Sequence, residues 1–598
     1  MTSQNSKKKS KTKSTQRKPT RKSVLPKGKN PNPQDINTLV ILFNHGRYPE
    51  METIARKMTV LFPKHGIGWK AMGTALLQQG RTAEALAPLQ KAAELSQGDA
   101  QPYNNLGNAF MKLGRLAEAE ASYLDALKLN PTFVEAYNNL VNALQEQGRF
   151  SEALERIRNM TCVIADQNTH ESADPKTTTP IVALLPFGRS GSLFFHSLFD
   201  GHPDIATLPG IYFKGWFGHD TWERFAPNLS DPKWRDRLVG QILNEFQPLF
   251  DARSKKNVVG TPLGPCDWLA KHSGFMEMGA DCSQPFIVDQ KSFATALLSL
   301  LAPLSSISQK ACFELIHRAF EVAIRGNTAA GSREGGQIFY HIHNPGPFEF
   351  ANFLYHYPQA RLLHIVRNPI QGMESWMLSE TDVETGFLAS LRNADPSGKL
   401  ESDYLLERWN KAVGKSVIVF NQLHSPFNTL AYSRGVRLED VKRDTKRVMP
   451  QIAAWMGIPD HPSLYEASFC GLQYWGPASN VTGKITGFDT KAIDRPAGRL
   501  LGLRDIMIFE TLFWPFSHQY GYTDLDIKGF RRQLAEIRPW LDEPLEFETK
   551  LYEELPDHTR LLKELPAYTR MHCLLQYNWA ALDRDGTYHG MVQPLSMD

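Results

Sequence analysis

A short loop with the sequence GRSGS lies at residues 188–192. It follows an apolar run at 181–185, which predicts a buried strand, and it precedes an apolar segment at 193–199, which predicts a helix. Free backbone N–H groups at such a helix start can bind an anion, and the helix dipole favours negative charge there. The residues expected to bind a phosphate-like group are Arg189, Ser190, Gly191 and Ser192.

A second anion-binding pattern begins at Arg367. The run at 362–366 predicts another buried strand, and Pro369 suits the first turn of a following helix. Ser375 lies eight residues after Arg367, so a strand–turn–helix would bring a guanidinium and a hydroxyl to one phosphate. The guanidinium fork can then bind two phosphate oxygens at once.

The loop at 188–192 differs from the phosphate loop of ATPases and GTPases. That loop follows the pattern G-x-x-x-x-G-K-[ST], and its Lys contacts the terminal phosphates. Here the loop is shorter, no Lys follows its last Gly, and the basic residue Arg189 lies two residues before Gly191. This departure disfavours an ATP-dependent kinase.

Two histidines, His341 and His343, lie in the segment before the Arg367 strand, which reads QIFYHIHNPG at 337–346. Residues two apart on a strand point to the same face, so both rings can be aimed at one bound anion. Histidine titrates near neutral pH and is the natural base for taking a proton from a hydroxyl. The alternative is that both rings are structural.

Together the two anion patterns resemble those of sulfotransferases that use 3′-phosphoadenosine-5′-phosphosulfate (PAPS). The loop at 188–192 is similar to the family's 5′-phosphosulfate loop, P-[KR]-S-G-[ST], and Arg367 with Ser375 is similar to its 3′-phosphate motif. Asn368 stands where the family often has Asp. The resemblance covers residues 180–525 and implies a sulfuryl-transferring enzyme with PAPS as co-substrate and no metal.

Two further segments occur in the family's order. Residues 434–459 resemble the RYEDL strand and the helix after it, with Leu438 in place of the usual Tyr. The segment SNVTGK falls where the family has a loop that covers the cofactor, which implies cofactor contacts for Gly483 and Lys484. Residues 211–335 match the family poorly and are interpreted as a family-specific insertion.

The resemblance also bears on the catalytic base. Cytosolic sulfotransferases carry K-T-H-L-P before the 3′-phosphate motif, and on this pattern His343 takes the position of the basic His and His341 that of the Lys. The Lys that stabilises the leaving oxygen is therefore absent, and Arg189, a protonated His341 or a residue from elsewhere, such as Lys291, must replace it. Tyrosylprotein sulfotransferases use a Glu after the first loop, where this chain has LPG at 208–210, so His is favoured as the base.

A repeat of 34 residues precedes the first loop. It is marked by Gly-Arg pairs at Gly46, Gly80, Gly114 and Gly148, by aromatic residues at Trp69, Tyr103 and Tyr137, and by alanines at Ala85, Ala119 and Ala153. The pattern is that of paired helices, in which Ala allows close approach and Gly ends the first helix with a left-handed backbone. It resembles tetratricopeptide (TPR) repeats over 34–158. TPR units stack, and the resemblance implies binding of a peptide or partner domain, or a role as spacer or dimerisation element.

The positive charge of the chain is concentrated at its N-terminus. Residues 1–30 hold nine Lys, two Arg and no acidic residue. Such a tail has little to bury and is expected to be disordered. It either only keeps the chain in solution or contacts nucleic acid, an acidic surface or an anionic membrane.

Cysteine usage and hydropathy indicate the compartment. The six cysteines are scattered without a C-x-x-C pair, which suggests neither a disulfide framework nor a zinc site and fits a reducing compartment. No run approaches the roughly 20 apolar residues that span a bilayer, and no apolar segment follows the basic N-terminus as in a secretory signal. We therefore expect a cytoplasmic protein.

The expected fold is an α-solenoid followed by an α/β domain with a parallel, P-loop-like sheet and helices on both faces. The expected domain order is a basic tail (1–33), TPR repeats (34–158), a linker (159–179), the sulfotransferase domain (180–525) and a C-terminal helical extension (526–598).

Two functions are compatible with this organisation. The first is transfer of a sulfuryl group from PAPS to a hydroxyl of a protein, glycan or small molecule, with the repeats binding a partner or the substrate. The second is a TPR scaffold whose sulfotransferase-like domain is inactive. The absent Lys favours the scaffold, whereas the intact Arg189, Arg367 and Ser375 favour the enzyme.

Overall fold

The structure is a computed structural model of the 598-residue chain. It describes residues 30–147, 179–257, 266–325, 336–381, 399–476, 487–551 and 566–596, apart from 97, 211, 220, 424, 426–427, 429, 492 and 589–590. Isolated residues are also described within 149–164 and 390–397. The basic tail up to residue 29, most of the predicted linker, and Gly483 and Lys484 lie outside the described residues. The chain divides between residues 97 and 98 into two compact units, and each is described by itself.

The first unit consists of helical hairpins built by the 34-residue repeat. Its helices are α1 (Pro33–Asn44), α2 (Tyr48–Leu61), α3 (Gly66–Gln78) and α4 (Thr82–Leu95). Gly46 and Gly80 have φ of +67° and +76°, the left-handed backbone predicted where the first helix of each pair ends. Ala55, Ala75 and Ala85 are fully buried, so the small side chains let paired helices approach closely.

The second unit begins with three more helices of the same repeat. These are α5 (Gln101–Lys112), α6 (Leu116–Leu129) and α7 (Val134–Glu146). Gly114 has a φ of +70°, and Ala119 is fully buried. A Cβ on Gly107 would lie 2.4 Å from the Tyr123 ring, so only glycine allows this approach. The predicted repeat pattern is confirmed.

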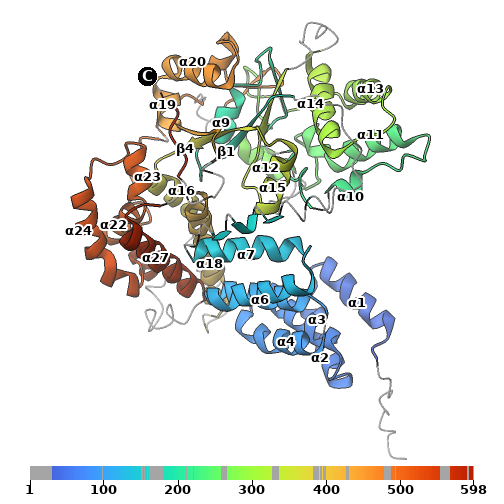
Figure 1. Ribbon diagram of the computed structural model, residues 1–598, viewed down its shortest axis with the longest axis vertical. Helices are drawn as coiled ribbons and strands as arrows, with labels where there is room; N and C mark the ends of the chain where they lie inside the picture. Colours follow the sequence, from blue (N-terminus) through green and yellow to red (C-terminus); the bar gives the residue numbers. More distant parts are fainter. Residues whose placement is uncertain are drawn as a thin grey trace, which may run out of the picture. The chain divides into compact units, whose positions relative to one another are not determined.

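A five-stranded parallel sheet follows in the second unit (Figure 1). The strand order is β2–β3–β1–β4–β5, with bounds β1 Ile181–Pro186, β2 Ile205–Thr207, β3 Gln337–His341, β4 Arg361–Val366 and β5 Ser433–Arg437. Continuous apolar runs such as IVALLP are typical of parallel strands that are covered on both faces. Because the strands run the same way, the loops after β1, β3 and β4 emerge at one edge, where α/β proteins bind ligands.

Alternate side chains of β1 point into two different cores, so helices cover both faces as predicted. Ala183 packs with the helical region at 212–320. Leu184 packs with α9 (Ser192–Ser197) and α20 (Thr445–Met456). At the functional edge, α15 (Pro347–His356) connects β3 to β4, α16 (Pro369–Thr381) and α18 (Lys399–Leu423) lie between β4 and β5, and α19 (Leu438–Arg443) follows β5.

The predicted insertion at 211–335 is a helical layer with an aromatic core. Its helices are α10 (Thr221–Phe225), α11 (Trp234–Glu245), η1 (Gln247–Leu249), α12 (Cys266–Ser273), α13 (Gln290–Leu301) and α14 (Gln309–Arg325). Phe213 stacks on Trp216 with 5.2 Å between ring centroids. Trp216 Nε1 donates to the backbone oxygen of Gln309 at 3.2 Å, and Gln309 Nε2 donates back to the Trp216 oxygen at 2.7 Å.

The C-terminal region packs on the repeats of the second unit. Helices α22 (Leu503–Leu512) and α23 (Trp514–Gln519) fall within the predicted domain at 180–525. The extension predicted to be helical from residue 526 contains α24 (Ile527–Ile537), η5 (Arg538–Asp542), α25 (Glu546–Leu551) and α27 (Pro566–Asp585). Arg570 of α27 binds Glu146 of α7 through two hydrogen bonds, Nη2–Oε1 at 2.5 Å and Nε–Oε2 at 3.1 Å. Farther along, the amide of Leu595 donates to the oxygen of Gly435 at 2.8 Å, which adds the last described segment to β5.

Helix α7 also contacts the functional edge of the sheet. The amide of Phe348, in the first turn of α15, donates to Oδ1 of Asn138 at 2.8 Å. Helix α7 of the repeats and helix α15 beside the sheet are therefore joined by a specific hydrogen bond. In the described parts of the chain, no helix combines the length and apolarity needed to span a bilayer.

Candidate active site

The loop after β1 folds as a tight turn at the carboxyl edge of the sheet. Gly188 and Gly191 have φ of +56° and +69°, a left-handed backbone that favours glycine. The hydroxyl oxygen of the buried Ser190 accepts the amide of Phe187 at 3.1 Å, which closes the turn. Arg189 and Gly191 are exposed, so the tip of the loop is open to a ligand.

Arg367 follows β4, and a hydrogen bond connects it to the loop of the first predicted phosphate motif. Its Nη1 donates to the backbone oxygen of Arg189 at 3.3 Å. Only 8% of Arg367 is exposed, and burial lowers the pKa of its guanidinium while Glu439 opposes the shift. Glu439 accepts the amide of Asn368 at 3.2 Å and the hydroxyl of Tyr522 at 2.8 Å. This buried carboxylate fixes the strand end that carries Arg367.

Asn368 also begins helix α16. Its Oδ1 accepts the amides of Ile370 and Gln371 at 3.1 Å each. Asn and Asp cap helices equally well, so Asn in the family's Asp position preserves the helix start. Ser375 lies half-buried on this helix, two turns after the cap. The structure therefore has Arg367 at the strand end and Ser375 on the following helix, as the sequence predicts.

Two residues of α19 contact different segments at this edge, Leu438 the first loop and Lys442 the chain at 487–489. A Cβ on Gly191 would lie 3.1 Å from the side chain of Leu438, so the residue that replaces the family's Tyr packs against the loop. Lys442 donates through Nζ to the backbone oxygens of Gly487 at 2.5 Å and Asp489 at 2.9 Å. Burial lowers the pKa of Lys442 to about 8.

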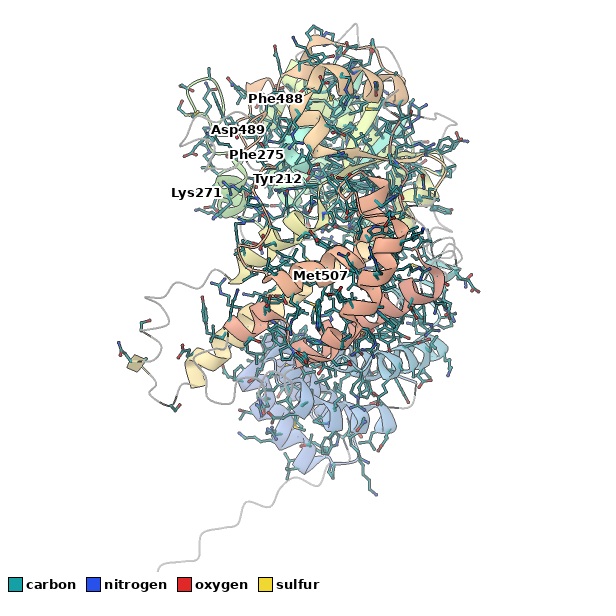
Figure 2. All side chains as sticks on the ribbon, turned by 90° about the vertical axis from the view of Figure 1, so that its left-hand side faces the viewer. Tyr212, Lys271, Phe275, Phe488, Asp489 and Met507 are labelled. Atoms are coloured by element: carbon teal, nitrogen blue, oxygen red, sulfur yellow. The ribbon has the colours of Figure 1, made fainter. Side chains whose placement is uncertain are left out.

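The chain just after the predicted covering loop lies beside α9. Phe488 packs edge-on against Phe194 of α9, with 5.0 Å between ring centroids. Figure 2 shows Phe488 and Asp489 on the same side of the unit as Tyr212 and Phe275. The expected cofactor contacts immediately precede this segment, but they lie outside the described residues.

The two predicted histidines lie at the same edge, at the end of β3. Strand β3 ends at His341, so His343 lies beyond it. Asn344 then turns the chain with a φ of +48°. The prediction that one strand carries both rings is therefore wrong, although their centroids are only 5.7 Å apart. A non-glycine residue with positive φ costs free energy and is often found at functional sites.

Burial lowers the pKa of both imidazoles and so favours their neutral form. It lowers the pKa of His343 to about 4, with the charges of Lys214 and Lys415 adding to the effect. It also lowers the pKa of His341 well below its ordinary value. A neutral His343 can accept a proton at pH 7. The same burial disfavours a protonated His341 as the replacement for the missing Lys.

A third histidine, His196 of α9, completes a cluster that the sequence did not single out. Its ring centroid is 5.4 Å from that of His341. His196 Nε2 lies 2.6 Å from the Thr207 hydroxyl, which itself donates to the oxygen of Phe339 at 2.8 Å, so Nε2 carries the proton. Neither ring nitrogen of His341 has a hydrogen-bond partner within the described residues. Buried polar atoms are usually paired, so a polar ligand at this edge would satisfy them.

Gln422, at the end of α18, links the phosphate loop to the expected base. Its Oε1 accepts the amide of Gly188 at 2.6 Å, and its Nε2 donates to Oδ1 of Asn344 at 2.8 Å. Asn344 Nδ2 lies 3.4 Å from Nε2 of His343. One amide side chain therefore holds the loop and the histidine in a fixed relation. No local sequence pattern marks a Gln for this role.

Acidic pH should destabilise the second unit through buried histidines, of which His317 is the cleanest test. It is fully buried, and burial lowers its pKa to about 4 from 6.5. Between these values the unfolded chain binds more protons, so this stabilisation is complete above pH 6.5 and lost as the pH falls toward 4. A tenfold difference in proton affinity between the folded and unfolded chain corresponds to about 1.4 kcal/mol of stability.

Denaturant unfolding of the native protein and of His317→Asn between pH 7.5 and 4.5 measures this contribution. The variant should lose less stability than the native protein over the same range. Equal pH slopes for the two proteins would show that His317 titrates normally in the folded state.

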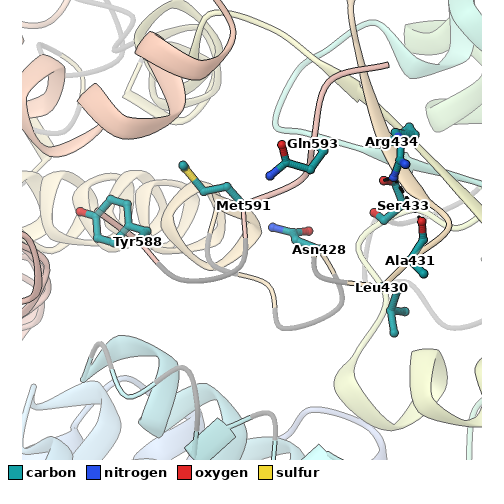
Figure 3. Close-up of a pocket in the computed structure, with 8 residues that line it drawn as sticks. All are labelled: Asn428, Leu430, Ala431, Ser433, Arg434, Tyr588, Met591 and Gln593. Atoms are coloured by element: carbon teal, nitrogen blue, oxygen red, sulfur yellow. Dashed lines mark hydrogen bonds between the residues drawn. The ribbon is translucent and has the colours of Figure 1, made fainter. Parts of the chain in front are cut away.

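Two cavities lie at the opposite edge of the sheet, where the strands begin. One of about 380 Å³ surrounds the start of β5 and is lined by residues that include Asn428, Ser433 and Tyr588 (Figure 3). Another of about 910 Å³ opens at the starts of β1, β3 and β4. Neither adjoins the carboxyl edge, where the predicted motifs meet.

Comparison with known proteins identifies the repeats. Residues 73–114 and 107–148 match a family model described as TPR repeat. No curated protein matches this chain. Among solved structures, MamA from Desulfovibrio magneticus RS-1 aligns with 24% of this chain and 78% of its own, at 22% identity and a TM-score of 0.21.

Two sulfotransferase domains align with larger parts of the chain. The domain from the curacin biosynthetic pathway aligns with 54% of this chain and 95% of its own, at 12% identity and a TM-score of 0.27. The domain from the Synechococcus PCC 7002 olefin synthase aligns with 50% and 80%, at 14% identity and a TM-score of 0.22. Likenesses at these values do not assign an activity. The chain carries TPR repeats at 73–148, followed by an α/β unit whose carboxyl edge gathers the two predicted phosphate motifs.

Proposed function

We propose that the second unit transfers a sulfuryl group from PAPS to a hydroxyl acceptor. The observation that carries the proposal is the hydrogen bond from Arg367 Nη1 to the backbone oxygen of Arg189, which joins the two phosphate motifs. The loop at 188–192 would hold the 5′-phosphosulfate, and Arg367 with Ser375 would hold the 3′-phosphate. His343 lies at the same edge of the sheet.

The residues at this edge fit an anionic nucleotide. The exposed, left-handed Gly191 keeps the tip of the loop accessible. Arg189 is also exposed at this tip, and Arg367 and Lys442 add positive charge. When bound, PAPS supplies an activated sulfuryl group, and the residues of this chain bind its phosphates and take up the acceptor proton.

His343 acts as the general base in this proposal. Its neutral ring accepts the proton of the acceptor hydroxyl, and Asn344 and Gln422 hold the ring relative to the phosphate loop. Sulfuryl transfer resembles phosphoryl transfer in its dependence on positioning and electrostatic stabilisation. The acceptor is a hydroxyl of a protein, glycan or small molecule, the repeats bind the partner or the substrate, and the reaction takes place in the cytoplasm without a metal.

A second candidate function is a TPR scaffold with an inactive sulfotransferase-like unit. The observation that favours it is the neutral His341 at the position of the family's Lys. The two functions differ in turnover, because only the enzyme moves label from sulfur-labelled PAPS to an acceptor in a cell extract. Nucleotide binding without any labelled product would favour the scaffold.

Adenosine 3′,5′-bisphosphate should raise the thermal stability of the protein. A ligand that binds only the folded state stabilises it by about 2.7 kcal/mol at one hundred times its dissociation constant. Adenosine 5′-monophosphate should have a much smaller effect because it lacks the 3′-phosphate. Arg367→Ala should remove most of the difference between the two nucleotides. Thermal unfolding with each nucleotide tests this, and equal shifts from both in the native protein would contradict the assigned role of Arg367 and Ser375.

A further inference from the structure

The proposed chemistry needs a cation that the family's position does not provide. His341 occupies that position, and its buried ring is neutral. Among the expected replacements, Lys291 is exposed at the start of α13, where its amide donates to Oδ1 of Asp289 at 3.1 Å. Arg189 is exposed at the tip of the phosphate loop. A different residue, Lys214, lies in a segment that is hydrogen-bonded to β3 and α15, the elements on either side of the expected base.

The chain on both sides of Lys214 is anchored to the elements that flank this base. Before it, the backbone oxygen of Phe213 accepts the hydroxyl of Tyr340, on β3, at 3.5 Å. After it, the amide of Gly215 donates to Oε1 of Glu349, in the first turn of α15, at 3.0 Å. Since β3 and α15 are joined by the short turn that contains His343, the same strand–turn–helix positions Lys214.

The segment that carries Lys214 is also rigid. Phe213 is 2% exposed and stacks on the fully buried Trp216. Trp216 and Gln309 exchange two hydrogen bonds. Gly215 has a φ of +84°, which fixes the turn immediately after the lysine. Lys214 itself is half-buried, so part of it is covered by protein rather than by solvent.

The charges around Lys214 agree with this placement. Burial lowers the pKa of the Lys214 ammonium, and the nearby carboxylate of Glu349 opposes the shift. Glu349 is held in place because it accepts the backbone amides of Gly215 and Gly346. The positive charges of Lys214 and Lys415 both act on His343 and add to the lowering of its pKa by burial.

We propose that Lys214 is the catalytic cation that stabilises the leaving group, an inference that rests on the proposed function. The acceptor oxygen forms a bond to sulfur while the bond between sulfur and the bridging oxygen of the 5′-phosphate breaks. The acceptor proton passes to His343, and the electron pair of the broken bond stays on the bridging oxygen, which becomes part of the 5′-phosphate of adenosine 3′,5′-bisphosphate. An ammonium beside that oxygen stabilises the charge that develops there.

Calorimetric binding of two nucleotides to the full-length protein tests the proposal without a known acceptor. Lys214→Met should weaken binding of adenosine 3′,5′-bisphosphate by about 10- to 100-fold, the usual effect of losing a charge-assisted hydrogen bond. Binding of adenosine 3′-monophosphate should be unchanged because it has no 5′-phosphate. Lys233→Met, a matched change at an exposed lysine of the same insertion, should leave both affinities unchanged.

Lys214→Arg provides a second measurement that does not depend on the folding of the Met variant. It should bind the bisphosphate nearly as tightly as the native protein at pH 7.5. Because burial lowers the pKa of Lys214, the native protein should lose more affinity for the bisphosphate at alkaline pH than the Arg variant, in which Lys442 still titrates but residue 214 keeps its charge.

The outcomes separate the two proposals. Unchanged bisphosphate affinity in Lys214→Met, or an equal loss for both nucleotides, would overturn the role of Lys214 and leave the proposed function intact. A native protein that binds neither nucleotide would overturn the proposed function itself.

Discussion

Replacing His343 with alanine should lower turnover by about 10²–10⁴-fold, the usual contribution of a general base. The ring is neutral at pH 7 because burial lowers its pKa to about 4, so in the native protein it is ready to accept a proton. The affinity for adenosine 3′,5′-bisphosphate should change little, since a base acts on the transition state more than on nucleotide binding. Single-turnover transfer from labelled PAPS to the acceptor, together with calorimetry, measures both quantities.

Arg367→Ala is the matched contrast, because it should weaken nucleotide binding by removing a charge-assisted contact. His343→Ala should therefore slow the bound complex and leave its affinity for nucleotide nearly unchanged, whereas Arg367→Ala should mainly lower that affinity. Near-normal turnover in His343→Ala would exclude it as the base, and attention would then turn to His341 or to an acidic residue of the 211–335 insertion.

Replacing Arg570 with methionine should lower the free energy of unfolding of the second unit by about 3–5 kcal/mol, the usual cost of leaving a buried charge without its partner. The carboxylate of Glu146 is 2% exposed at its side chain and receives two hydrogen bonds from Arg570. Methionine fills a similar volume but leaves that carboxylate without a counter-charge. Denaturant unfolding at pH 7.5 measures the loss.

The Arg538–Asp542 pair provides the control for this substitution. Its ions are 2.9 Å apart, with side-chain exposures of 43% and 56%. Solvent-exposed pairs contribute at most about 1 kcal/mol, so Arg538→Met should have little effect. Equal losses in the two variants would show that the contact between α27 and α7 contributes no more than a surface pair.

The local elements of the site could be predicted because each has a short-range signature. Apolar runs at 181–185 and 362–366 are long enough for buried strands and too short for helices, and both are strands in the structure. Gly46, Gly80 and Gly114 of the repeat occupy left-handed turns, as their 34-residue spacing indicates. Asn368 caps helix α16 as an Asp would, so the second motif keeps its helix start with Asn in the position where the family often has Asp.

The rest of the site depends on contacts between residues far apart in the chain. Gln422 reaches the amide of Gly188 across 234 positions, and nothing near it in the sequence predicts that bond. Lys214 lies in a segment that matches the family poorly, and its placement becomes visible only once its neighbours are seen bound to β3 and α15. The pKa of His343 likewise depends on burial, which a strand pattern does not give.

Helix α15 obtains part of its N-terminal cap from the repeat array. The first amides of a helix have no acceptor within it, and for Phe348 the acceptor is Asn138 of α7. The helix begins four residues after His343, so this contact with the repeats stabilises the helix that directly follows the expected base. A partner that drew α7 away would remove this cap and change nucleotide affinity. Thermodynamic linkage then requires bound nucleotide to change the affinity for that partner by the same factor.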